Sequence, residues 1–283
     1  MTELKYGITP INFGPNSYPE NMASVAKTAE EAGFDSVWVG DHPFLSEKQK
    51  NMPPSLRILD PIAALAYVAG QTRRILLGTG ILLLPQFNPI IVAKQLASLD
   101  VLSNGRLVVG IGVGWSDHEF EVLGLPFGDR GKRTDDYLKA IEVLWSEDRP
   151  AYHGQYVSFD RLQSFPHVVQ RPHPRIVVGG GSPAAFRRAV ESGNGWFGYG
   201  MDLKDTKRCL EGLRKASKRY SRPKSLGELE ISIAPSMPID KATARQFVEL
   251  GVDRLILILP ERGDLFQMEH FVKEAGSRLV GQT

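Results

Sequence analysis

Short runs of hydrophobic residues alternate along the chain with longer segments in which hydrophobic positions recur every three or four residues. The short runs predict strands buried on both faces, as in a parallel sheet, and the longer segments predict helices that cover such a sheet. The predicted strands span residues 4–9, 36–40, 74–80, 107–113, 175–178, 195–199, 230–234 and 254–259. About eight strand–helix units of this kind predict an α/β protein with the (β/α)8 TIM-barrel fold.

Residues at the helix boundaries support this spacing. Asp60–Pro61, Asn88–Pro89 and Ser182–Pro183 each place a capping side chain directly before a proline, which favours a helix start. Ser116 and Glu119 lie three residues apart, as in a capping box, so Glu119 is interpreted as the capping partner of Ser116. The predicted helices begin near residues 19, 60, 88, 131, 182, 204, 240 and 265.

Segment 149–174 interrupts this rhythm. Tyr152, Tyr156 and Phe159 around Gly154 predict a short hairpin, and a proline-rich return follows. The segment is interpreted as an insertion before the fifth strand, within a single domain that spans residues 1–283. The alternative fold is a doubly wound open sheet, but no Gly-x-Gly-x-x-Gly follows the first strand, where a dinucleotide-binding fold would place it.

The composition excludes some classes of partner. The chain has 283 residues, a formal net charge of +2 and one cysteine. Such a small charge does not suggest nucleic acid, and Cys209 alone excludes an internal disulfide or a multi-cysteine metal site. The first residues lack a signal-like apolar segment, and no apolar stretch is long enough to span a bilayer. A cytoplasmic protein without a membrane partner is expected, and a homodimer is an alternative to a monomer.

Segment 36–44 joins a predicted strand to polar side chains. Asp41 and His42 follow an apolar run that contains Trp38. In a barrel of parallel strands, the loops at the carboxyl ends of the strands carry the chemistry. Histidine is the side chain best able to move a proton near neutral pH, so Asp41 and His42 are candidate catalytic residues. The alternative is a carboxylate that caps the next turn beside a surface histidine.

Three predicted strand ends carry glycine clusters, at residues 78–80, 110–114 and 179–181. Glycine at a strand end allows a second backbone or a flat ligand to approach closely; the alternatives are tight packing and a flexible turn. The third cluster runs into Ser182 and a helix start, where free amides and the helix dipole suit a phosphate group. The candidate anion site therefore consists of Gly179, Gly180, Gly181 and Ser182.

Taken together, these segments resemble the bacterial luciferase-like monooxygenase superfamily. The matching motifs lie at residues 38–42, 77–80, 112–115, 178–182 and 195–197, in this order along nearly the whole chain. Within the superfamily, the chain most resembles the actinobacterial branch that uses the deazaflavin coenzyme F420. The resemblance implies a coenzyme ring at the C-terminal mouth of the barrel.

The resemblance also implies roles for particular residues. The back of the coenzyme ring would lie against a bulge with a non-proline cis peptide, at Gly80–Ile81 or a neighbouring bond. Asp41 and His42 would contact the coenzyme and handle the proton that accompanies hydride transfer. Residues 180–182 would lie near the phosphate-bearing tail, and His118 would lie close to a polar contact with the coenzyme.

The substrate is expected to be a small organic molecule. Relatives that oxidise sugar phosphates carry a glutamate where this chain has Trp115, which argues against a sugar phosphate. Phe44 and Trp115, in loops near the predicted mouth, are candidates for the substrate pocket, whereas Trp38 is expected in the core. The loop 44–59, including residues 48–51, is a candidate lid.

Four functions are open on these grounds. The first is hydride transfer between coenzyme F420 and a small substrate, and the second is a monooxygenase that uses flavin mononucleotide (FMN). The third is a barrel that holds a coenzyme without turning it over. The fourth, a metal-dependent hydrolase, is disfavoured because the first strand carries no histidine, and no metal site is predicted.

Overall fold

A computed structural model describes residues 3–48 and 52–281, and within these ranges eight parallel strands close into a barrel. The strands are β1 (Lys5–Thr9), β2 (Ser36–Val39), β3 (Leu76–Thr79), β5 (Leu107–Gly112), β8 (Arg175–Gly179), β9 (Gly195–Met201), β10 (Glu230–Pro235) and β11 (Arg254–Ile258). They pair in that order, and β11 closes the ring on β1. The TIM-barrel prediction is confirmed.

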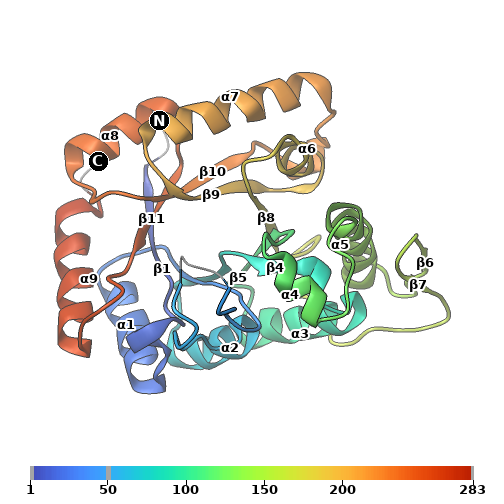
Figure 1. Ribbon diagram of the computed structural model, residues 1–283, viewed down its shortest axis with the longest axis horizontal. Helices are drawn as coiled ribbons and strands as arrows, with labels where there is room; N and C mark the ends of the chain where they lie inside the picture. Colours follow the sequence, from blue (N-terminus) through green and yellow to red (C-terminus); the bar gives the residue numbers. More distant parts are fainter. Residues whose placement is uncertain (1–2, 49–51, 282–283) are drawn as a thin grey trace.

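The helices that connect the strands surround the barrel (Figure 1). They are α1 (Pro19–Glu31), α2 (Pro61–Gln71), α3 (Pro89–Leu102), α5 (Arg130–Ser146), α6 (Pro183–Ser192), α7 (Leu203–Arg219), α8 (Lys241–Leu250) and α9 (Leu265–Leu279). The side chains of Asp60, Asn88 and Ser182 cap α2, α3 and α6, as their spacing before proline predicts. Short elements complete the fold: η1 (Gly14–Ser17), β4 (Leu82–Leu83), η2 (Leu84–Gln86), α4 (Asp117–Val122) and η3 (Lys224–Leu226).

The insertion forms the predicted hairpin. Strands β6 (Tyr152–His153) and β7 (Ser158–Phe159) pair antiparallel and lie beyond α5, away from the barrel (Figure 1). Asp136 of α5 accepts hydrogen bonds from the backbone amide of Tyr156 and from the hydroxyl of Tyr152, both at 2.7 Å. A single half-buried carboxylate on α5 therefore anchors the hairpin.

Large side chains fill the interior of the barrel. Trp38 of β2 and Phe197 of β9 stack with ring centroids 5.8 Å apart, and both are buried. A Cβ atom at Gly78 of β3 would lie 2.3 Å from the Trp38 ring, so only glycine fits beside this tryptophan. The expectation that Trp38 fills the core is confirmed. Within the described residues, no helix is both long and apolar enough to cross a membrane.

Candidate active site at the barrel mouth

Two loops bring polar side chains together at the carboxyl ends of the strands. Asp41 and His42 follow β2, and Trp115 and the short helix α4 follow β5, two strands further round the barrel. Because parallel strands end at the same rim, side chains 77 positions apart in the sequence meet there.

Glu119 of α4 holds the imidazole of His42. The Nδ1 atom of His42 lies 2.7 Å from Oε1 of Glu119, and Nε2 of Gln86 donates to Oε2 of the same carboxylate at 2.8 Å. Only 1% of the surface of Glu119 is exposed, so the carboxylate is removed from water. The interpretation of Glu119 as a capping partner is wrong: Ser116 does cap α4, but the Glu119 carboxylate turns to His42 and Gln86 instead.

This contact determines which nitrogen of His42 carries the proton. A carboxylate without a proton only accepts hydrogen bonds, so we assign Nδ1 of His42 as the donor to Glu119. In the neutral ring, Nε2 is then a free acceptor, and it makes no hydrogen bond with any described residue. The Trp115 ring meets the imidazole edge to face, with centroids 6.0 Å apart, which further fixes the ring orientation.

Asp41 anchors the backbone beside the mouth. Its Oδ2 atom accepts a hydrogen bond from the amide of Leu83 at 2.8 Å, and the residue is 7% exposed. Burial raises the pKa of Asp41 to about 7, although the Leu83 hydrogen bond and the nearby His42 act in the opposite direction. The carboxyl group therefore holds the segment that follows β3 and titrates close to neutral pH.

The segment that Asp41 holds carries the cis peptide that the resemblance implies. The bond between Gly80 and Ile81 is cis, which confirms that prediction. The Ile81 side chain turns toward the barrel axis: a Cβ atom would lie 1.9 Å from it at Gly112 and 2.9 Å from it at Gly179. At these two positions, the strand-end glycines make room for Ile81, so close packing explains their spacing.

The predicted anion site lies on the far side of the mouth, between β8 and α6. Gly180 has φ +113°, a conformation that favours glycine, and both Gly181 and Ser182 are exposed. Ser182 uses its own hydroxyl to cap the amide of Ala185 at 3.2 Å, so fewer helix amides are free than the sequence suggests. Among the described residues, the amides of Gly181, Ser182 and Ala184 still have no acceptor.

The remaining candidates lie at the rim. Nδ1 of His118 lies 3.1 Å from Oε2 of Glu121 on the same helix, and the His118 ring meets Phe44 edge to face at 6.1 Å. Trp115 is 52% exposed at the rim, and its place in a substrate pocket stays a prediction. Of the candidate lid, residues 49–51 lie outside the described residues. The structure thus joins His42 with Trp115 and Phe44 with His118. It adds Gln86, which no local pattern marked, and Glu119, which the local pattern marked only as a capping residue.

Several known proteins are similar to this chain. An uncharacterized protein of Mycobacterium tuberculosis (strain ATCC 25618 / H37Rv) is 31% identical over 254 residues, which is 85% of this chain and 87% of the relative. The F420-dependent glucose-6-phosphate dehydrogenase of Kineococcus radiotolerans is 32% identical over 233 residues, which is 80% of this chain and 66% of the relative.

Solved structures share the fold. The coenzyme F420 dependent tetrahydromethanopterin reductase from Methanopyrus kandleri matches with a TM-score of 0.78 and 18% identity over 99% of both chains. The monooxygenase RslO1 from Streptomyces bottropensis matches with a TM-score of 0.76 and 22% identity over 98% of this chain and 99% of the other. The family model of the luciferase-like monooxygenases matches residues 8–266, and the chain belongs to this family.

Proposed function

We propose that the chain is an oxidoreductase that transfers a hydride between the deazaflavin coenzyme F420 and a small organic substrate at the barrel mouth. The observation that carries the proposal is the contact between His42 and Glu119, which prepares a proton-transfer group at the rim. The similarity to an F420-dependent dehydrogenase supports the choice of coenzyme.

The described residues fit such a coenzyme at two places. The exposed amides of Gly181 and Ser182, beside Gly179 and Gly180, would hold its phosphate group. Gly80 and Ile81, supported by the hydrogen bond of Asp41, would back the ring, and the coenzyme would supply the hydride chemistry. We place His118 at the edge of this site.

The residues of this chain would then manage the proton. Nε2 of His42 takes up or releases the proton that accompanies hydride transfer. The Glu119 carboxylate keeps the ring in one orientation and stabilises the imidazolium that forms when Nε2 is protonated. Phe44 and Trp115 line the substrate side, where they exclude water from the reacting atoms.

A second candidate is an FMN-dependent monooxygenase, supported by the match to the family of luciferase-like monooxygenases. A barrel that holds a coenzyme without turnover is the third. Parallel calorimetric titrations of the purified chain with F420 and with FMN distinguish the first two. We expect micromolar or tighter binding of F420, and binding of FMN alone would move the protein to the monooxygenases. Oxidation of reduced F420 when candidate substrates are added would exclude the non-catalytic barrel.

A glycine variant tests where the phosphate group lies. Gly181→Asp should weaken F420 binding more than about tenfold, because it adds bulk and a like charge. The control is Gly70→Asp, which makes the same change on the exposed surface of α2 and should leave the affinity unchanged. Equal affinities in the two folded variants would refute the placement at α6.

A further inference from the structure

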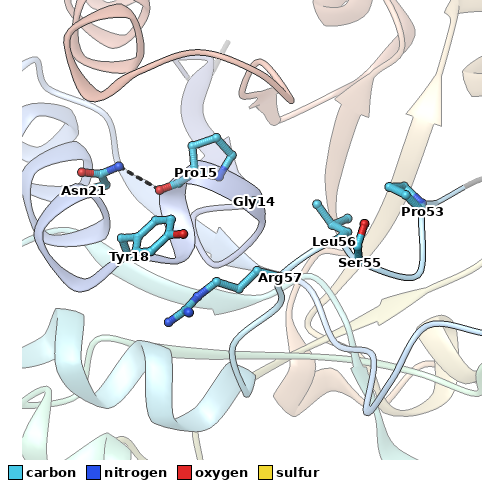
Figure 2. Close-up of a pocket in the computed structure, with 8 residues that line it drawn as sticks. All are labelled: Gly14, Pro15, Tyr18, Asn21, Pro53, Ser55, Leu56 and Arg57. Carbon is cyan, nitrogen blue, oxygen red and sulfur yellow. Dashed lines mark hydrogen bonds between the residues drawn. The ribbon is translucent and has the colours of Figure 1, made fainter.

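A groove of about 440 Å³ lies at the rim, between the β1–α1 connection and segment 53–57 (Figure 2). One wall carries Pro15 and Tyr18, and the other carries Pro53, Leu56 and Arg57. Because α1 starts directly after Tyr18, the groove opens on the mouth side of the barrel. Its second wall belongs to the candidate lid loop 44–59, but neither His42 nor Trp115 lines it.

Backbone contacts tie both walls to the strand ends. The amide of Gly14 donates to the carbonyl of Arg57 at 2.8 Å, and the amide of Leu59 donates to the carbonyl of Asn12 at 3.1 Å. The Asn12 side chain also donates to the carbonyl of Gly40, at the end of β2, at 2.9 Å. These bonds hold both walls in place without a ligand, and Asn12 connects them to Gly40, two residues before His42.

Arg57 gives the groove a positive charge without a negative partner. Arg57 is exposed, and its guanidinium carbon lies 4.8 Å from the centre of the Tyr18 ring, a cation–π contact (Figure 2). Among the described residues, no carboxylate or carbonyl accepts from this guanidinium. The contact with Tyr18 uses none of the N–H donors, and a carboxylate can accept two parallel hydrogen bonds from a guanidinium.

The rest of the lining suits a carbon skeleton. Tyr18 lies beside the charged group, and Pro15, Pro53 and Leu56 add apolar surface elsewhere along the groove (Figure 2). A small organic acid, with a flat or aliphatic body and one carboxylate, has the matching distribution of polar and apolar surface.

The position of the groove indicates which ligand it would serve. The proposed phosphate site follows β8, which lies four strands from β1 around the barrel and therefore across the mouth. A coenzyme whose phosphate group is anchored there would direct its ring end, and not its phosphate, toward the groove. We infer that the groove binds the carboxylate end of an organic acid substrate whose reacting end lies on the side of Phe44 and Trp115, with Arg57 as the residue that selects it. This inference rests on the function proposed above.

Binding of simple acids tests the inference without turnover. The probes are benzoate, phenylacetate and acetate, with benzamide as the neutral match to benzoate, measured by calorimetry on the full chain without coenzyme. We expect benzoate to bind at least about tenfold more tightly than benzamide, and Arg57→Gln to remove that preference. Arg57→Lys should keep part of it, because lysine retains the charge but neither the stack nor the paired donors.

The matched control is Arg73→Gln, an exposed arginine just before β3 at the opposite end of the barrel, which should change nothing. Failure of all three acids to bind, or equal benzoate binding by the Arg57→Gln protein, would overturn the site. Parallel titrations with F420 distinguish failure of the groove assignment from failure of the proposed function. If Arg57→Gln weakens F420 as much as benzoate, the groove serves the coenzyme and the substrate assignment is wrong. If wild-type protein binds benzoate but not F420, the proposed function fails and the groove stands.

Discussion

The two ends of the barrel differ in whether their charged and polar groups have partners. At the amino ends of the strands, buried Arg254 donates to Asp35 at 2.8 Å and pairs with Glu230. Glu230 also contacts Lys5 at 3.1 Å and Arg175 at 3.3 Å. Burial lowers the pKa of Arg254, but Asp35 and Glu230 outweigh it, so the pKa is raised and the charge is kept. Each of these charges has an opposite charge beside it.

At the mouth, some polar groups have no hydrogen-bond partner among the described residues. Burial brings the pKa of Asp41 to about 7, and Nε2 of His42 has no partner among the described residues. The buried hydroxyl of Thr9, at the end of β1, has none in the described structure either. One barrel thus separates a satisfied end, which contributes stability, from an unsatisfied end, which is available for chemistry.

Removing the imidazole should have the largest effect on the mouth. General acid–base steps contribute about 100-fold to 10,000-fold, so His42→Ala should lose turnover in that range while the dissociation constant of F420 changes far less. The measurement is steady-state turnover with an identified substrate, beside calorimetry with F420. His270→Ala, exposed on α9, is the control. Near wild-type turnover would remove His42 from the mechanism, and an equal loss of affinity would make it a binding residue.

Removing the central charge of the opposite end should affect stability instead. Arg254→Met leaves Asp35 and Glu230 without their shared partner and should lower the free energy of unfolding by about 3–5 kcal/mol. Arg175→Met removes a half-exposed partner of the same Glu230 and should cost about 0–1 kcal/mol. Urea denaturation measures both. If the folded Arg254→Met protein bound F420 more weakly, the two ends would not be independent.

The pKa of Asp41 predicts how stability depends on pH. Because the folded-state pKa is raised from 3.8 to about 7, the folded protein holds a proton that the unfolded chain releases, and stability falls as pH rises between these values. Asp41→Asn removes this slope while keeping an acceptor for Leu83. The free energy of unfolding of the variant, relative to that of the wild type, should therefore rise from pH 4 to 7 by at most a few kcal/mol. Above pH 7 this difference should stay constant.

Urea unfolding of both proteins across this pH range measures the gain. Glu249→Gln, an exposed carboxylate on α8, serves as the control and should leave the shape of the stability curve unchanged. Parallel curves for the wild type and Asp41→Asn would show that Asp41 stays ionised in the folded protein.

The smallest effect concerns the cap of α4. Ser116→Ala removes the hydrogen bond to the amide of Glu119 and should cost about 1 kcal/mol or less. Turnover should change little, because His42 and Gln86 still hold the carboxylate. A loss of turnover as large as that of Glu119→Gln would mean that the cap, and not these two contacts, positions Glu119.

The sequence predicts the fold better than the site, for a physical reason. Buried parallel strands are visible as local apolar runs, and caps such as Ser182 depend on residues within one turn. The bond between His42 and Glu119 joins positions 77 residues apart, and the local spacing from Ser116 offered a simpler explanation for the glutamate. Likewise, Gly112 looked like a ligand wall because nothing local shows that Ile81 fills the space.

The position of the proton on His42 shows whether Glu119 prepares this ring for proton transfer. In ¹⁵N-labelled protein at a pH of about 8, where an unperturbed imidazole is neutral, long-range ¹H–¹⁵N correlation spectra distinguish the two ring nitrogens. His42→Ala assigns the signals. The contact with Glu119 predicts a proton on Nδ1 and a bare Nε2 in the wild type. In Glu119→Gln, the preference for a proton on Nδ1 should be lost. A proton on Nε2 with a bare Nδ1 would contradict it, because Glu119 would then not hold the ring for proton transfer at the mouth.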